Sequence, residues 1–278
     1  MLIDSHQHFW KLDNKFYHWL SPKQTVLYRD YCPEQLLPHL KDLQINKTIL
    51  VQAADTVFET DMLLKIFEKY EFIAGVVGWI DLESEHFVDV YERLKKHRGF
   101  IGVRPMLQDL VDDDWILRPA VLKNIEQLVK DDFPIDLLIF PRHLPVIIQL
   151  LEWFPGLRAV INHIAKPDIG KELLQPYGDY IEKVASFPNV MCKLSGLITQ
   201  SKQPFNISDI RRYVHHVIKV FGTDSVMFGS DWPVCLLAGS YQDVYNVLLE
   251  ALPTNLSYKE KEAIFAGNAN KFYKLNLL

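Results

Sequence analysis

The run Ile73-Ala-Gly-Val-Val-Gly-Trp-Ile80 is continuously apolar and is too short for a buried helix. It lacks the alternation of polar and apolar residues that marks a half-exposed strand, so it predicts a strand buried on both faces of a parallel sheet. Similar runs recur along the chain, at Leu2–Ile3, Thr48–Val51, Ile101–Val103, Ile135–Phe140, Ala159–Ile161, Val190–Cys192 and Val226–Phe228. The sequence therefore predicts eight buried strands.

Segments with helical periodicity separate these strands. In 208–222 the apolar residues recur at the i, i+3, i+4, i+7 spacing of one helix face, with Ser208 as the expected N-cap and Gly222 at the end. The other predicted helices lie near residues 33–45, 60–70, 84–97, 118–131, 144–154, 177–187 and 240–252. A last segment, Ser257–Leu275, predicts an extra C-terminal helix packed on the outside.

Eight strands that are each followed by a helix are typical of a (β/α)8 TIM barrel in the α/β class. An open doubly wound sheet is the alternative architecture. Eight units is the number that closes a barrel, and no long linker divides the chain. We therefore expect a single barrel domain over residues 1–278.

The composition of the 278-residue chain excludes several classes of protein. Lys+Arg 30 against Asp+Glu 35 gives a net charge of −5, which argues against nucleic acid as a partner. The sequence has no uninterrupted apolar stretch of roughly 18 residues, so we expect no membrane span. Three cysteines without a C-x-x-C pair, and no secretory signal, favour a reduced cytoplasmic protein. The sequence does not predict the oligomeric state.

Polar side chains follow the predicted strands, where barrel enzymes carry their catalytic groups. His6 and His8 lie two residues apart on the first strand, so their side chains point to the same face. His163 and Asp231 follow the sixth and eighth strands, and such a set can chelate one divalent metal ion. The alternative is that these polar groups only fill the top of the barrel. The remaining strand ends contribute Gln52, Trp79, Arg104, Lys166 and Lys193.

The connection from Phe9 to Cys32 is long and rich in aromatic residues, and it directly follows the first strand. We expect it to be a lid or a pocket wall. The alternative is an apolar flap that covers the ends of helices.

Seven motifs together point to a known family, namely Asp4-Ser-His-Gln-His-Phe-Trp10, Val51-Gln-Ala53, Gly75–Leu82, Gly102-Val-Arg104, Asn162-His-Ile-Ala-Lys-Pro167, Cys192-Lys-Leu-Ser-Gly196 and Phe228–Cys235. They resemble the sugar-lactonase branch of the amidohydrolase superfamily, which includes L-fucono-1,5-lactonase-like enzymes and, more distantly, 2-pyrone-4,6-dicarboxylate lactonase. The similarity extends in order from residue 2 to about residue 275. The resemblance implies a (β/α)8 hydrolase that opens a lactone.

The resemblance also implies roles for these residues. Asp231 is expected to activate the attacking water, with His6, His8 and His163 around it. Arg104, Lys193 or the imidazoles would stabilise the oxyanion, and His163 or His8 would protonate the leaving oxygen. Binding of a small-molecule sugar lactone is assigned to Trp10, Gln52, Trp79, Lys166 and the cations Arg104 and Lys193.

Most amidohydrolases hold two metal ions bridged by a carbamylated lysine on strand four. This sequence has Arg104 there, and no histidine ends the fifth strand. We therefore expect either no required metal or one divalent ion such as Zn²⁺, with His6, His8 and Asp231 as ligands. Two alternative functions are a zinc-dependent decarboxylase of the same superfamily and a barrel that binds a sugar acid without turning it over. The motifs around His163 and Lys193 favour the lactonase.

Overall fold

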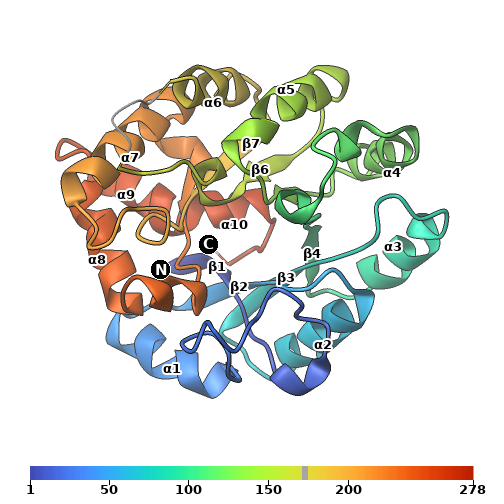
Figure 1. Cartoon of the computed structure of the whole chain (residues 1–278), viewed down its shortest axis with the longest axis horizontal. Coiled ribbons are helices and arrows are strands. Elements are labelled where there is room, and N and C mark those ends of the chain that lie inside the picture. The colour runs from blue at the N-terminus through green and yellow to red at the C-terminus, as the bar shows by residue number, and fades with distance from the viewer. Residues whose placement is uncertain (171–174, 278) are drawn as a thin grey trace.

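The computed structural model describes residues 1–170 and 175–277. Its eight strands form one parallel sheet in chain order, which confirms the predicted TIM barrel. They are β1 (Ile3–Gln7), β2 (Lys47–Val51), β3 (Ile73–Gly78), β4 (Phe100–Val103), β5 (Ile135–Leu137), β6 (Ala159–Ile161), β7 (Val190–Leu194) and β8 (Val226–Phe228). In Figure 1 the helices surround these strands as an outer ring.

The first and last strands are joined by hydrogen bonds that continue past the end of β8. The amide of Asp231 donates to the His6 carbonyl at 2.8 Å, and the amide of His8 donates to the Trp232 carbonyl at 2.7 Å. The Ser5 hydroxyl also donates to the carbonyl of Phe228 at 2.6 Å. The residues after β8 are thereby fixed beside the residues that end β1.

Eight helices follow the strands, at α1 (Pro33–Asp42), α2 (Val57–Phe67), α3 (Phe87–Lys95), α4 (Pro119–Lys130), α5 (Leu144–Trp153), α6 (Tyr177–Ala185), α7 (Ile207–Phe221) and α8 (Tyr241–Ala251). The N-cap of α7 is Asn206 and not Ser208, because the Asn206 side chain accepts a hydrogen bond from the Ser208 amide at 2.8 Å. Gly222 ends α7 as predicted, at a φ of 77° that favours glycine. Among the described residues, no helix is both long and apolar enough to cross a membrane.

The C-terminal segment closes the barrel. It consists of α9 (Tyr258–Glu262), a π-helical turn and α10 (Asn268–Phe272). The prediction that it packs on the outside is wrong, because its apolar face covers side chains from the barrel strands, and Figure 1 shows α10 across the centre of the ring. This cluster contains Ile3, Ile49, Val51, Val77, Val160, Met227, Ala266, Ala269, Phe272 and Tyr273.

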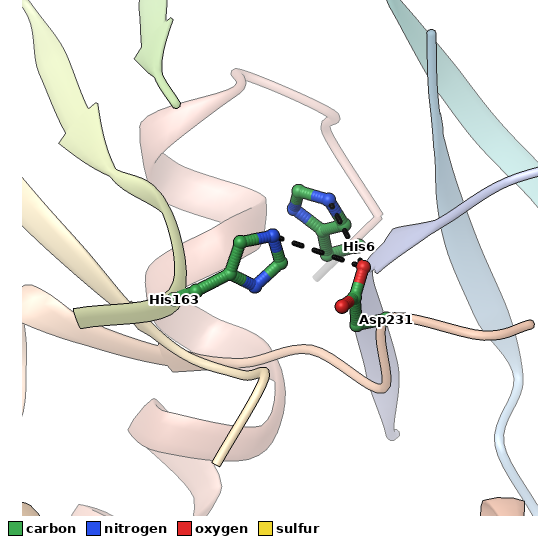
Figure 2. Close-up of side chains that lie close together, drawn as sticks. All are labelled: His6, His163 and Asp231. Carbon is green, nitrogen blue, oxygen red and sulfur yellow. Dashed lines mark ion pairs between the residues drawn. The ribbon is translucent and has the colours of Figure 1, made fainter. Parts of the chain in front are cut away.

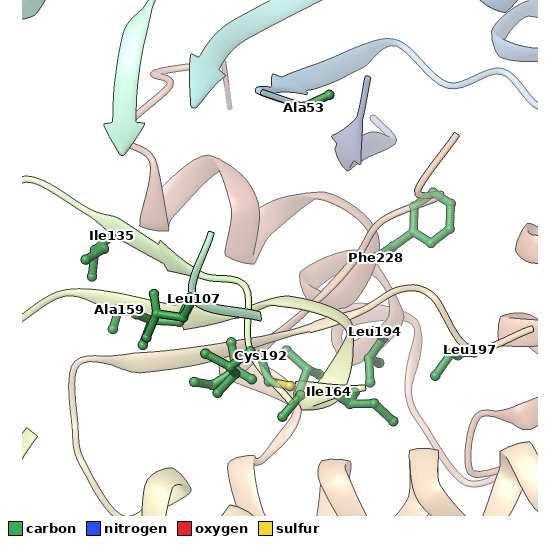
Figure 3. Packing of buried hydrophobic residues seen from close by; sticks show 14 of the residues in the cluster. Ala53, Leu107, Ile135, Ala159, Ile164, Cys192, Leu194, Leu197 and Phe228 are labelled. Atoms are coloured by element: carbon green, nitrogen blue, oxygen red, sulfur yellow. The ribbon is translucent and has the colours of Figure 1, made fainter. Parts of the chain in front are cut away.

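A larger apolar cluster lies between the strands and the surrounding helices. Figure 3 shows part of it, where Ile135, Ala159 and Cys192 of three neighbouring strands pack together. Burial of each large side chain contributes about 1.5–3 kcal/mol. This packing makes the barrel a rigid frame for the polar residues at its open end.

Candidate active site

Three histidines and one carboxylate converge at the carboxyl ends of β1, β6 and β8. Oδ1 of Asp231 lies 3.3 Å from Nε2 of His8 and 3.7 Å from Nε2 of both His6 and His163. Nε2 of His6 lies 3.2 Å from Nε2 of His8. In Figure 2 the imidazole rings of His6 and His163 lie next to each other and face the Asp231 carboxylate, and dashed lines mark the two ion pairs. The structure therefore brings together the four residues that the sequence analysis singled out, and all four are buried.

The segment after β6 holds His163 in a left-handed turn. The φ angles of His163, Ile164, Ala165 and Lys166 are 53°, 48°, 63° and 51°. A left-handed conformation costs roughly 1–2 kcal/mol for each residue that has a Cβ atom. The turn is held by the Lys166 amide, which donates to the His163 carbonyl at 2.7 Å. Strain of this kind is common at functional sites, and here it directs His163 and Lys166 toward one cavity.

A buried carboxylate at Asp4 links β1 to the segment that carries Asp231. It accepts hydrogen bonds from the Ser230 amide at 2.8 Å and the Ser230 hydroxyl at 2.6 Å. It also accepts from the Tyr241 hydroxyl at 2.9 Å and from the His6 amide at 3.0 Å. Burial raises the pKa of Asp4, and the hydrogen bonds from Ser230 oppose this shift. This role of Asp4 was not predicted, although a carboxylate directly after the apolar run Leu2–Ile3 was a signal for it.

Arg104 lies beside the histidines, and Gln52 holds it there. Nη1 of Arg104 lies 3.3 Å from Nε2 of His6, while Nη2 donates to the Gln52 carbonyl. In return, the Gln52 side chain donates to the Arg104 carbonyl at 2.8 Å. We expected Gln52 to bind substrate, but its side chain is fully buried and does not line the cavity. Its hydrogen bonds orient Arg104. Burial lowers the pKa of Arg104, and the charges of Asp136 and Asp231 oppose that shift.

Lys193 lies beneath His6 and not at the mouth of the barrel, where we expected it. Its Nζ atom lies 2.7 Å from Oδ2 of Asp136, 2.8 Å from the Ser5 carbonyl and 3.3 Å from Nδ1 of His6. The expectation is corrected because β7 extends to Leu194, which puts Lys193 inside the strand and not after it. The side chain has no exposed surface and therefore has no access to a ligand in the cavity.

The cavity above these residues has a volume of about 230 Å³. It is lined by His8, Trp19, Gln24, Leu27, Ala53, Arg104, Met106, Gln108, Leu138, His163, Lys166, Asp231, Val234 and Leu237. The connection from Phe9 to Cys32 contributes Trp19, Gln24 and Leu27 to this lining, which agrees with its predicted role as a pocket wall. Lys166 donates to Oε1 of Gln108 at 2.6 Å, and burial lowers the pKa of this lysine. Trp19 was missed in the sequence, although the aromatic enrichment of its loop was a signal for it.

Two tryptophans expected to bind substrate lie outside this cavity. Trp10 is 1% exposed, and its indole N–H donates to the Arg29 carbonyl at 2.8 Å. Its ring packs in T-shaped contacts with Trp19 and Tyr31, so it supports the aromatic loop from behind. Trp79 lines a separate cavity next to the first.

The electrostatics keep Asp231 charged. Burial alone would raise its pKa, but the neighbouring His163 and His8 imidazoles and the charge of Lys166 lower the pKa to about 2. Burial lowers the pKa of His6 and His163 well below the usual value, so both imidazoles are neutral near pH 7. The site therefore contains an ionised carboxylate among neutral imidazoles, with Arg104 alongside.

The donor set fits a single divalent ion. Nδ1 of His8 lies 2.8 Å from the Val51 carbonyl, which directs the lone pair on Nε2 of neutral His8 toward Asp231. Ligand atoms around a tetrahedral zinc ion are about 3.4 Å apart, given Zn–N distances of about 2.0–2.1 Å. Four of the six separations among the four donor atoms of this site, at 3.2–3.7 Å, match that spacing, and the ligand atoms of His6, His163 and Asp231 all lie within 4.8 Å of one another. Arg104 follows β4 with Nη1 3.3 Å from Nε2 of His6, and a guanidinium does not coordinate a metal ion, so the donor set fits a single ion.

Comparison with known proteins places this geometry in a family. An L-fucono-1,5-lactonase from Burkholderia ambifaria is 37% identical over 99% of this chain and 96% of its own length. An amidohydrolase from Burkholderia multivorans, solved with bound zinc, is 32% identical with a TM-score of 0.92 over 99% of each chain. A probable 2-pyrone-4,6-dicarboxylic acid hydrolase from Acinetobacter baumannii shares the fold, with a TM-score of 0.78 at 19% identity over 98% of this chain and 99% of its own. The pattern of the amidohydrolase family matches residues 3–275. This chain belongs to the amidohydrolase family.

Proposed function

We propose that this protein hydrolyses a small sugar lactone, of the L-fucono-1,5-lactone type, to the corresponding sugar acid. The observation that carries the proposal is the ionised Asp231 carboxylate at the wall of a 230 Å³ cavity, with Arg104 and Lys166 lining the same space. The similarity over nearly the full length to an L-fucono-1,5-lactonase supports it.

In this proposal Asp231 is the general base. Water in the cavity gives its proton to Oδ1 of Asp231 while its oxygen attacks the lactone carbonyl. The developing negative charge on the carbonyl oxygen is stabilised by the guanidinium of Arg104, a contribution that is typically about 3–4 kcal/mol per donor. A pKa of about 2 keeps Asp231 ionised at neutral pH, so its carboxylate has a free lone pair for the proton of water.

Collapse of the tetrahedral intermediate breaks the bond to the ring oxygen, which needs a proton. Nε2 of His8 lies 3.3 Å from Oδ1 of Asp231 and faces the same cavity, so His8 can relay the proton from Asp231 to the leaving oxygen. His163 is the second group in position for this transfer. The product carboxylate then lies beside Arg104 and Lys166.

Where a single divalent ion is bound, His6, His8, His163 and Asp231 would hold it, and it would supply Lewis-acid chemistry at the lactone carbonyl. The imidazole Nε2 atoms would then be occupied, and Asp231 would itself return the proton to the leaving oxygen. A related amidohydrolase was solved with zinc, which supports this part of the proposal.

Two residues that we expected to contact the substrate have a positioning role instead. Lys193 contacts His6, and Gln52 contacts Arg104, so these two residues position groups of the candidate site.

The unpaired cysteines Cys32, Cys192 and Cys235 support a reducing compartment such as the cytoplasm.

A pH-indicator assay over sugar 1,4- and 1,5-lactones tests the proposal, run on the wild type and on Asp231→Asn, with and without a chelator. Acid release by the wild type and its loss in Asp231→Asn are expected. Release of carbon dioxide from aromatic acids, with no lactone hydrolysis, would favour the decarboxylase instead. Binding of sugar acids without any turnover would favour the non-catalytic barrel.

A further inference from the structure

A second cavity adjoins the one that contains Asp231. Its volume is about 450 Å³, and the two cavities share Trp19, Ala53 and Met106 as lining residues. It opens beside the carboxyl ends of β2 and β3, where Ala53 and Trp79 follow the strands. The proposed reaction uses only the smaller cavity and leaves this adjoining space without a role.

The walls of the second cavity are unusually aromatic. Phe16, Trp19, Trp79 and Trp115 all line it, and each of the four side chains is only partly buried. They come from three separate parts of the chain, namely the long first connection, the end of β3 and the segment before α4. Partly exposed aromatic faces of this kind are apolar surfaces on which a sugar ring can stack.

Polar groups on the same walls are mainly acceptors. Asp55, Asp81 and Asp109 line the cavity, and all three are exposed. Oδ1 of Asp81 accepts from the Glu83 amide at 2.9 Å, and the Asp109 carboxylate accepts from Gln108 at 3.3 Å. Carboxylates have further lone pairs for hydroxyl donors, whereas they repel an anionic group. The chemistry of this cavity therefore suits a neutral ring that carries hydroxyl groups.

We propose that this cavity is a second sugar subsite, and that the substrate is an aldonolactone carrying a glycosyl substituent. The inference rests on the proposed lactonase function. The lactone ring occupies the smaller cavity beside Asp231, and the glycosyl ring stacks against Trp79 and Trp115. Water adds to the lactone carbonyl and the ester C–O bond breaks, while the glycosidic bond remains intact. The product is a disaccharide aldonate.

The experiment compares matched pairs of 1,5-lactones. D-Glucono-1,5-lactone is paired with cellobiono- and maltobiono-1,5-lactone, and L-fucono-1,5-lactone tests the basal reaction. We expect kcat/KM for at least one disaccharide lactone to exceed that of its parent by about tenfold. Trp79→Ala and Trp115→Ala should each reduce this ratio by a large part of that factor. Trp153→Ala is the matched control, because Trp153 is 51% exposed on α5 and lies outside both cavities.

A disaccharide lactone that is no better than its parent, or a ratio that neither variant changes, overturns the subsite while the lactonase assignment stands. If none of the lactones is hydrolysed, the proposed function fails, and binding then decides the subsite. In that case the disaccharide aldonates should still bind more tightly than the monosaccharide aldonates, as measured by quenching of tryptophan fluorescence. Trp115→Ala should remove this difference in affinity. Equal affinities for the two kinds of aldonate would overturn the subsite in this arm as well.

Discussion

Oδ1 of Asp231 lies 3.3 Å from Nε2 of His8, and both atoms belong to side chains that are almost completely buried. The two residues come from opposite ends of the chain, and the hydrogen bonds between β1 and the segment after β8 bring them together. Because Nδ1 of His8 faces the Val51 carbonyl, the other nitrogen of this ring is available to Asp231. This pair is the centre of the proposed proton transfer.

Replacing Asp231 by asparagine should remove the general base and leave the fold intact. General-base catalysis typically contributes about 10²–10⁴-fold, so kcat should fall by that factor. The amide is nearly the same size as the carboxylate, and thermal unfolding should confirm that the protein is folded. Asp89→Asn, an exposed position on α3, is the control and should keep full activity. Normal hydrolysis by a folded Asp231→Asn protein would reject the assignment.

The donor set should bind one zinc ion per chain. Metal analysis after incubation with zinc and removal of the excess is expected to give one equivalent for the wild type. His8→Ala and Asp231→Asn should each give clearly less, whereas His86→Ala should not, because His86 is an exposed residue away from the site. Two equivalents in the wild type would contradict the inference that the donor set fits a single ion.

The barrel could be predicted because its strands are buried on both faces. Runs such as Ile73–Ile80 and Val226–Phe228 have no polar interruption. This pattern can be recognised without knowing which elements pack against the strand. The convergence of His6, His163 and Asp231 then followed from topology, since the carboxyl ends of all parallel strands meet at one end of a barrel.

Positions that depend on where a strand stops could not be predicted. Lys193 follows an apolar run, yet the backbone pairing continues through Leu194 and keeps its side chain inside the barrel. The left-handed turn at His163 contains no glycine that would indicate it. Contacts from distant residues hold it instead, since Oγ of Ser195 lies 2.8 Å from Nδ1 of His163 and the Tyr177 hydroxyl donates to the Ile164 carbonyl. The C-terminal helix has an apolar face in either location, so its sequence does not distinguish the outside of the barrel from its closed end.

Lys193 should matter for stability more than for substrate affinity. Lys193→Met leaves the Asp136 carboxylate buried without its cation, which typically costs about 3–5 kcal/mol. Urea denaturation should show this loss, and a second change, Asp136→Asn, should recover part of it. Lys166→Met is the comparison, since Lys166 lines the cavity and its loss should mainly raise KM. A Lys193→Met protein with normal stability and a raised KM would return Lys193 to a substrate-binding role.

The left-handed turn should respond unusually to glycine. Ala159 and Ala165 are both fully buried, but only Ala165 has a positive φ, of 63°. Ala159→Gly in β6 should cost about 1–2 kcal/mol through chain entropy and the lost methyl group. At Ala165 the release of a conformational cost of roughly 1–2 kcal/mol should cancel that loss. Equal destabilisation of the two variants in urea denaturation would show that the turn is not strained.

Glu59 should make stability depend on pH. Its carboxylate is buried and accepts hydrogen bonds from the Ala53 and Ala54 amides, at 2.8–3.0 Å, in the segment that lines the cavity. Burial raises its pKa to about 8 against the opposing effect of these amides. In the unfolded chain a glutamate releases its proton near pH 4.3. Between these two values only the folded protein retains the proton, so the stabilisation present below pH 4.3 is lost as the pH rises toward 8.

The slope of that loss is up to about 1.4 kcal/mol per pH unit. It should appear as a falling difference in unfolding free energy between the wild type and Glu59→Gln, measured in urea from pH 6.5 to 8. Glutamine cannot ionise, so the variant should have the flatter profile. Glu126→Gln, an exposed change on α4, should run parallel to the wild type. If the wild type and Glu59→Gln also run parallel, Glu59 carries the same charge in the folded and unfolded chains over this range, and its pKa is not raised by burial.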